Sequence, residues 1–133
     1  MLIRFCTLVA ILFLGCSHLA MSQTIASKVE YVGTSQYLSI TGLKTREVNG
    51  LLNLIVEIAN SDTSDQEGYY RMEWFDADGF PAWGEEAWKP ILLHGSQRQK
   101  LQVIAPTIKA LDFKIVFSGD RNWANNPSPG QNQ

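Results

Sequence analysis

The chain has 133 residues, of which 45% are hydrophobic and 18% are charged, and its formal net charge is −2. This length and composition indicate one folded domain and exclude a disordered chain, and the absence of any run of lysine or arginine argues against a nucleic-acid partner. The two cysteines are Cys6 and Cys16, so the body of the protein has no internal disulfide.

Residues 1–15 have the pattern of a lipoprotein signal peptide. Arg4 precedes an uncharged apolar stretch, Phe5 to Leu14, which is shorter than the about 20 residues that span a bilayer. The sequence FLGC, ending in Gly15 and Cys16, resembles a bacterial lipobox. The resemblance implies cleavage before Cys16, which then carries a diacylglycerol on its sulfur and a fatty acid on its amine. The alternative is an ordinary secretory signal cut after Ala20-Met21-Ser22.

The segment after Cys16 predicts where the protein is held. Residues 16–28 are mostly small or polar and suit a lipidated tether, in which twelve extended residues reach at most ~40 Å. Ser17 stands where the inner-membrane retention signal of enteric bacteria has aspartate. We therefore expect a lipid-anchored, periplasm-facing protein of the bacterial cell envelope, in the outer membrane, whose N-terminal lipid is its membrane contact.

From residue 29 onward the chain alternates apolar and polar residues with the period of two that half-buried antiparallel strands show. Pro- and Gly-rich turn signals recur between these runs. The pattern predicts an all-β fold, an immunoglobulin-like antiparallel β-sandwich of about 6–8 strands over residues 29–122, with Trp74 on a central strand. Residues 123–133 predict a disordered C-terminal tail. The expected inward-facing residues are Leu52, Leu54, Val56 and Ile58; Tyr70, Met72 and Trp74; Leu101, Val103 and Ala105; and Leu111, Phe113, Ile115 and Phe117.

The sequence DADG, from Asp76 to Gly79, has two interpretations. A calcium loop of the EF-hand type needs oxygen ligands at further alternating positions and a glutamate at the twelfth. Here Phe80 takes the next alternating position and Ala87 the twelfth. Asp-Gly after an alternating strand is also a common turn signal. We therefore predict a structural turn, and no metal or cofactor.

No group of residues in the sequence predicts a catalytic mechanism. His94, the histidine of the body, lies in a turn beside Gly95 without another ligand or base at a suitable spacing, and it is expected to be structural. Glu85 and Glu86 are adjacent acids in a loop and are expected to be solvated. No catalytic residue is therefore assigned.

Aromatic residues gather in the stretch from Tyr69 to Trp88. If Trp74 faces the core, then Phe80, Trp83 and Trp88 lie near the hairpin tip and its return strand. Clustered exposed aromatics mark binding sites, so these three residues form the candidate interaction surface, for a protein or for a sugar ring. The alternative is that they only close the core and loops of a small sandwich.

The same stretch carries a family resemblance. From about Val48 to Phe117 the chain resembles the YcfL family of bacterial envelope lipoproteins. The matching residues are Tyr70-Arg71, Trp74-Phe75-Asp76 with Gly79, Trp88, Ala105-Pro106 and the last alternating strand. The resemblance implies an immunoglobulin-like sandwich and a lipid-anchored periplasmic location. It implies no activity, although the genetic neighbourhood of the family suggests a role in the cell envelope.

Three functional hypotheses follow. The first is a non-catalytic protein-interaction module that binds an envelope protein partner. The second is a glycan or peptidoglycan-binding module that uses Trp83 and Trp88. The third is a small envelope hydrolase that uses Asp76, Glu85 or Glu86, which requires two carboxyl groups about 5–10 Å apart in one cleft. An edge strand also allows a homodimer.

Overall fold

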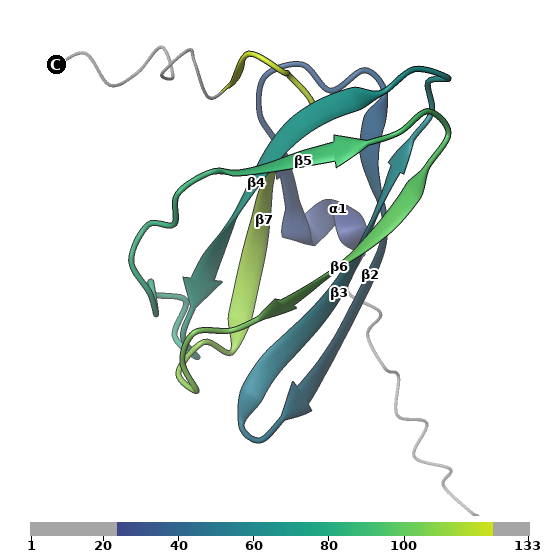
Figure 1. The fold of residues 1–133 in the computed structure, drawn as a ribbon. Coiled ribbons are helices and arrows are strands. Elements are labelled where there is room, and N and C mark those ends of the chain that lie inside the picture. Colours follow the sequence, from purple (N-terminus) through teal and green to yellow (C-terminus); the bar gives the residue numbers. More distant parts are fainter. Residues whose placement is uncertain (1–23, 124–133) are drawn as a thin grey trace, which may run out of the picture.

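The computed structural model describes residues 24–123 (Figure 1). The predicted signal peptide, the predicted lipid attachment at Cys16 and residues 124–133 of the predicted tail lie outside these residues. Among the described residues, no helix is long and apolar enough to cross a membrane. The elements are α1 (Ile25–Lys28), β1 (Val29–Tyr31), β2 (Leu38–Val48), β3 (Leu51–Asn60), β4 (Gln66–Phe75), β5 (Lys89–Leu93), β6 (Arg98–Ile104) and β7 (Asp112–Ser118).

The strands form two sheets that pack face to face (Figure 1). Sheet A has the order β1-β7-β4-β5, and sheet B has the order β2-β3-β6. Trp74 lies on β4, an inner strand of sheet A. The predicted all-β sandwich of six to eight strands is therefore confirmed, with seven strands among residues 24–123.

The strand order is that of an immunoglobulin-like sandwich with one replacement. In the strand nomenclature of the immunoglobulin fold, β2, β3 and β6 occupy the positions of strands A, B and E. Strands β7, β4 and β5 occupy the positions of strands F, C and C′. The place of G, beside F, is filled by β1. Strand β1 pairs parallel to β7, with Val29 opposite Ile115, so this edge differs from the antiparallel pairing of the other strands.

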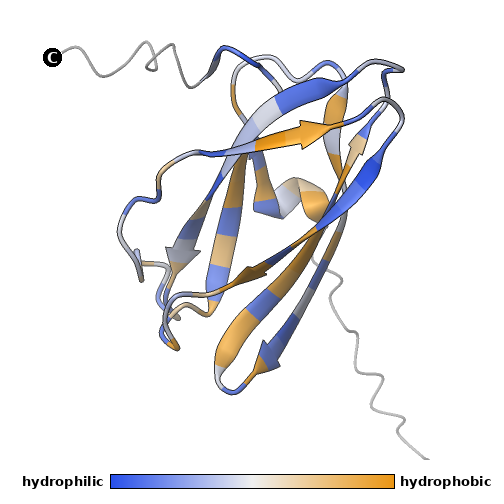
Figure 2. Cartoon of the chain, in the orientation of Figure 1, coloured by the Kyte–Doolittle hydropathy of each residue, from blue (hydrophilic) through white to orange (hydrophobic). Residues whose placement is uncertain are grey.

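The core lies between the sheets, where the inward residues of both meet. Hydropathy alternates along the strands, as Figure 2 shows, because successive side chains of a strand point to opposite faces. The predicted inward residues of β3, β4, β6 and β7 are confirmed, with one exception. Leu111 precedes β7 and is exposed, since the strand begins only at Asp112.

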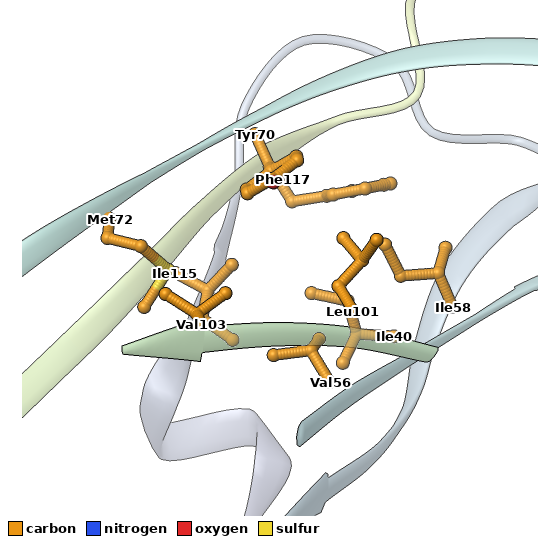
Figure 3. Close-up of a pocket in the computed structure, with 9 residues that line it drawn as sticks. All are labelled: Ile40, Val56, Ile58, Tyr70, Met72, Leu101, Val103, Ile115 and Phe117. Carbon is orange, nitrogen blue, oxygen red and sulfur yellow. The ribbon is translucent and has the colours of Figure 1, made fainter. Parts of the chain in front are cut away.

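Nine apolar side chains from the two sheets converge in the middle of the sandwich (Figure 3). Tyr70, Met72, Ile115 and Phe117 come from sheet A, and Ile40, Val56, Ile58, Leu101 and Val103 come from sheet B. The space that they surround has no volume for a water-sized molecule. This interior is therefore packed core and not a ligand cavity.

Hydrogen bonds of polar side chains hold the loops at the end where β3 and β5 finish. The amide of Asn60 is buried and donates to the carbonyl oxygens of Ser64, Leu93 and His94. In the next turn, hydrogen bonds donated first by the Ser64 hydroxyl, and also by Thr63 N–H and Gln66, lower the pKa of Asp62 below its ordinary value of 3.8.

The folded part extends beyond the predicted domain at both ends. Residues 25–28, within the predicted tether, form α1, where Ile25 packs against the core and Lys28 Nζ donates to Asp112 Oδ1. Trp123, the first residue of the predicted tail, is half-buried and packs edge-to-face on Trp88. Both extensions are explained by contacts with residues distant in the sequence.

Candidate functional site

The DADG segment is a turn, as predicted. Asp76 Oδ1 accepts hydrogen bonds from the backbone N–H groups of Asp78 and Phe80. Asp76 N–H donates to Phe80 O, and Gly79 adopts a φ of 83°, a conformation that glycine reaches without steric cost. The Asp76 carboxylate is thus occupied in holding the turn that ends β4.

After this turn the loop runs back along β4, beyond the point where β5 stops pairing with it. Phe75 bridges to Pro81, and Ala82 N–H donates to Trp74 O. The loop thereby covers the edge of β4, whose polar backbone groups would otherwise be unpaired.

Glu86, in the same loop, also bonds to β4, and the prediction that it is solvated is wrong. Its carboxylate accepts hydrogen bonds from the Trp74 indole N–H at 3.1 Å and from Met72 N–H at 3.3 Å. It also pairs with Lys89. Glu85, next to it, is exposed and pairs with Arg71. The two adjacent glutamates therefore differ in role because neighbouring side chains of an extended segment point in opposite directions.

Two of the three predicted surface aromatics are exposed. Phe80 is 68% exposed and Trp83 is 52% exposed, and both lie on the part of the loop that flanks the end of β4. Neither ring stacks on another aromatic ring among residues 24–123.

Trp88 lies elsewhere and does not join them. It precedes Lys89, which pairs with Tyr70, so Trp88 lies level with Arg71. Phe80, in contrast, lies level with Asp76. These levels are five residues apart on β4, about 17 Å of extended strand. The predicted surface of three aromatics is therefore not one patch, because Trp88 is separated from Phe80.

Trp88 is half-buried on the outer face of sheet A, together with Arg71 and Trp123. The Arg71 guanidinium lies 4.9 Å from the Trp88 ring centroid, and the Trp123 ring meets that of Trp88 edge-to-face at 5.9 Å. Arg71 also pairs with Glu73 and Glu85. Cation–π and charge contacts hold this group in place, so Trp88 presents only part of its surface to solvent.

A surface groove of about 260 Å³ lies near this group, between the outer sides of β4 and β5. Its lining includes Tyr69, Pro90 and the exposed Leu92, with Glu67 at the same face. The sequence contains one indication of this groove, because Pro90 and Leu92 occupy alternate positions of KPILL and therefore share a face of the strand. That indication could be used only once the inward face of β5 was known.

The acidic side chains of this region have structural partners, whereas the buried Nε of Arg71 has no hydrogen-bond partner among residues 24–123. Asp76 caps a turn, Glu85 pairs with Arg71, and Glu86 accepts from Trp74. His94 is exposed, with Nδ1 at 3.1 Å from Asp65 Oδ2. Within residues 24–123, no three His, Cys, Asp or Glu side chains are grouped so that they could hold a metal ion.

The chain is similar to a protein family and to solved structures. Residues 22–118 match the family described as "Protein of unknown function (DUF1425)". A crystal structure of the Campylobacter jejuni protein cj0090 has 21% identity and a TM-score of 0.60, and the match covers 70% of this chain and 98% of that one. A DUF1425 member from Shewanella sp. PV-4 has 22% identity and a TM-score of 0.55, over 65% and 83% of the two chains. No curated protein matches the chain in sequence.

Proposed function

We propose that this chain, which belongs to the DUF1425 family, is a lipid-anchored envelope protein of the YcfL type that binds another envelope protein and catalyses no reaction. The proposal combines two features. The lipobox-like sequence ending at Cys16 supports the anchor, and the outer face of sheet A offers a surface suited to a protein partner.

The groove between β4 and β5 is the observation that carries the binding role. With about 260 Å³, it is smaller than the roughly 300–1,000 Å³ of small-molecule pockets. Its lining combines Tyr69, Pro90 and Leu92 with Trp88 and Arg71 close by. Tyrosine, tryptophan and arginine are the residue types enriched in the energetic centres of protein interfaces.

The partner is expected to contact side chains and not to extend the sheet. Strand β5 is an edge strand, and Pro90 in it lacks the backbone N–H that an added strand would need. A side chain of the partner inserted between Tyr69 and Leu92 fits this groove better than a pairing strand does.

In-cell photocrosslinking of the full-length protein tests the binding role. A crosslinking amino acid replaces Leu92, which lines the groove, and the control carries it at Ile55, exposed on the outer face of sheet B. We expect a discrete band of higher mass from Leu92 and none from Ile55. A band at twice the mass of the protein would instead indicate a homodimer. Equal labelling from both positions would contradict the proposed surface.

Co-sedimentation with purified sacculi distinguishes the glycan-binding alternative from the proposed protein binding. A peptidoglycan binder sediments with sacculi and no longer does so after Trp83→Ala, whereas we expect the protein to stay in the supernatant.

The anchor has its own test, because Cys16→Ser removes the acylated thiol. We expect this variant to lose the acyl mass and to leave the membrane fraction, and an unchanged membrane fraction would contradict lipidation at Cys16.

A further inference from the structure

One end of the sandwich carries most of the exposed apolar surface. Of the ten large hydrophobic side chains that are exposed among residues 24–123, six lie at the end where β2, β4 and β6 finish. They are Val48, Phe80, Trp83, Ile104, Ile108 and Leu111. Figure 2 shows apolar segments at this lower end, at the β2–β3 tip and in the neighbouring loops. Exposed apolar groups gathered in this way mark a contact site.

The three connections at this end adjoin one another. Leu111 N–H donates to Phe75 O at 2.9 Å, which joins the β6–β7 connection to the end of β4. Ile108 lies against Gly50 in the β2–β3 turn, where an added Cβ would be 3.5 Å from its Cγ2 atom. The six side chains therefore belong to one continuous end of the molecule, the apolar end.

The N-terminal segment enters the fold from the same side. Strand β1 runs parallel to β7, and β7 begins at the apolar end with Asp112. The residues before β1 consequently lie toward that end, and Lys28, the last residue of α1, bonds to Asp112. A chain that leads back from Thr24 therefore starts on the side of the apolar end.

We propose that the apolar end rests on the surface of the lipid bilayer to which the protein is anchored. This inference depends on the anchor at Cys16 in the proposed function. Seven residues, 17–23, separate that cysteine from the described fold, and seven extended residues reach at most about 25 Å. So short a connection keeps the domain beside the bilayer, with its N-terminal side and hence its apolar end turned toward it.

The chemistry of this end favours the boundary between headgroups and acyl chains. Tryptophan prefers that boundary, and aliphatic and aromatic side chains on loop tips insert into it. The charged residues nearby are Lys28, Arg46, Glu47, Asp76, Asp78, Lys109 and Asp112, three basic and four acidic. With so little net charge, docking would depend on apolar burial and not on anionic lipids, so salt should not release it.

This orientation agrees with the proposed partner site. The groove at Leu92 lies near the start of β4, because Leu92 pairs with Glu67, and this is the opposite end from Phe80 and Ile108. A domain that rests on the bilayer through the apolar end would present Leu92 to the periplasm. The two surfaces could then act at the same time.

Spin labelling of the acylated, full-length protein in vesicles tests the orientation. Signal cleavage removes Cys6, and acylation blocks Cys16, so Ile108→Cys and Leu92→Cys each provide one free thiol for a nitroxide label. The two side chains are 66% and 48% exposed, which makes them a matched pair. Power saturation compares the access of oxygen, which dissolves in lipid, with that of a water-soluble nickel chelate.

We expect the label at 108 to favour oxygen over the nickel chelate several-fold more than the label at 92 does, in neutral and in anionic vesicles, at low and at high salt. If the protein floats with the vesicles but both labels are equally accessible to the nickel chelate, the inference about the apolar end would be overturned. The anchor would not be affected by that result. A label at 108 immobilised only with a protein partner present would assign the apolar end to that partner instead. Mass spectrometry of the N-terminal peptide reports the anchor separately, and an unacylated Cys16 would overturn both proposals.

Discussion

Replacing Glu86 tests whether a loop carboxylate completes the sheet. Its side chain is 17% exposed and accepts from the Trp74 indole at 3.1 Å and from Met72 N–H at 3.3 Å. In Glu86→Ala both donors lose their acceptor, and each unsatisfied buried group costs about 1–3 kcal/mol. Because both sites are only partly buried, we expect a total loss of about 2–4 kcal/mol in the free energy of unfolding. For a domain of this size that lowers Tm by on the order of 10–20 °C.

Urea unfolding followed by tryptophan fluorescence measures this change, with far-ultraviolet circular dichroism as a second probe. Glu86→Gln keeps a carbonyl acceptor and loses the charge, so it should lose about 1 kcal/mol. The matched control is Glu85→Ala, because Glu85 is 71% exposed and forms a surface ion pair with Arg71 that contributes about 0–1 kcal/mol. A Glu86→Ala variant as stable as Glu85→Ala would refute the assigned role of the carboxylate.

Three further changes probe the loops and the C-terminal boundary. Hydrogen bonds to the Asp62 carboxylate lower its pKa, so the ionised group stabilises the fold above pH 3.8, and this stabilisation is lost as pH falls through the pKa of the folded state. In Asp62→Asn the free energy of unfolding should therefore decrease less steeply as pH is lowered, and an unchanged pH profile would contradict this. Gly95→Ala would place a Cβ 1.9 Å from Thr63 O, and we expect a loss of more than about 2 kcal/mol by chemical denaturation, whereas a neutral result would contradict the close approach. Trp123→Ala removes the ring packed on Trp88 and should lower the free energy of unfolding by about 1–2 kcal/mol in the same assay. If Trp123 were disordered, this substitution would leave the stability unchanged.

Much of the fold follows from the sequence. Alternation with a period of two placed β3, β4, β6 and β7 and assigned their inward faces, because the pleat forces neighbouring side chains to opposite sides. The DADG turn was equally local, since Asp76 bonds its own neighbours and Gly79 supplies the positive φ. The error at Leu111 arose because the pattern continues one residue beyond the pairing of β7 with β4.

The candidate site was less predictable. The sequence drew attention to Phe80, Trp83 and Trp88 together, but spacing along a loop does not state how the loop returns. Its course along the edge of β4 carries Trp88 away from Phe80 and brings it to Arg71 and Trp123. Glu85 and Glu86 look alike in the sequence, and only the position of the Trp74 indole distinguishes them.

The sequence by itself therefore determined the class of fold, the core faces and the local turns, since each depends on residues within a few positions of one another. Only the tertiary structure decided that β1 lies parallel to β7 in the place of the last strand, and that six apolar side chains share the end from which the chain enters. These features join residues far apart in the sequence. Side-chain patterning specifies which face of a strand is buried, but it does not specify which strand lies beside it.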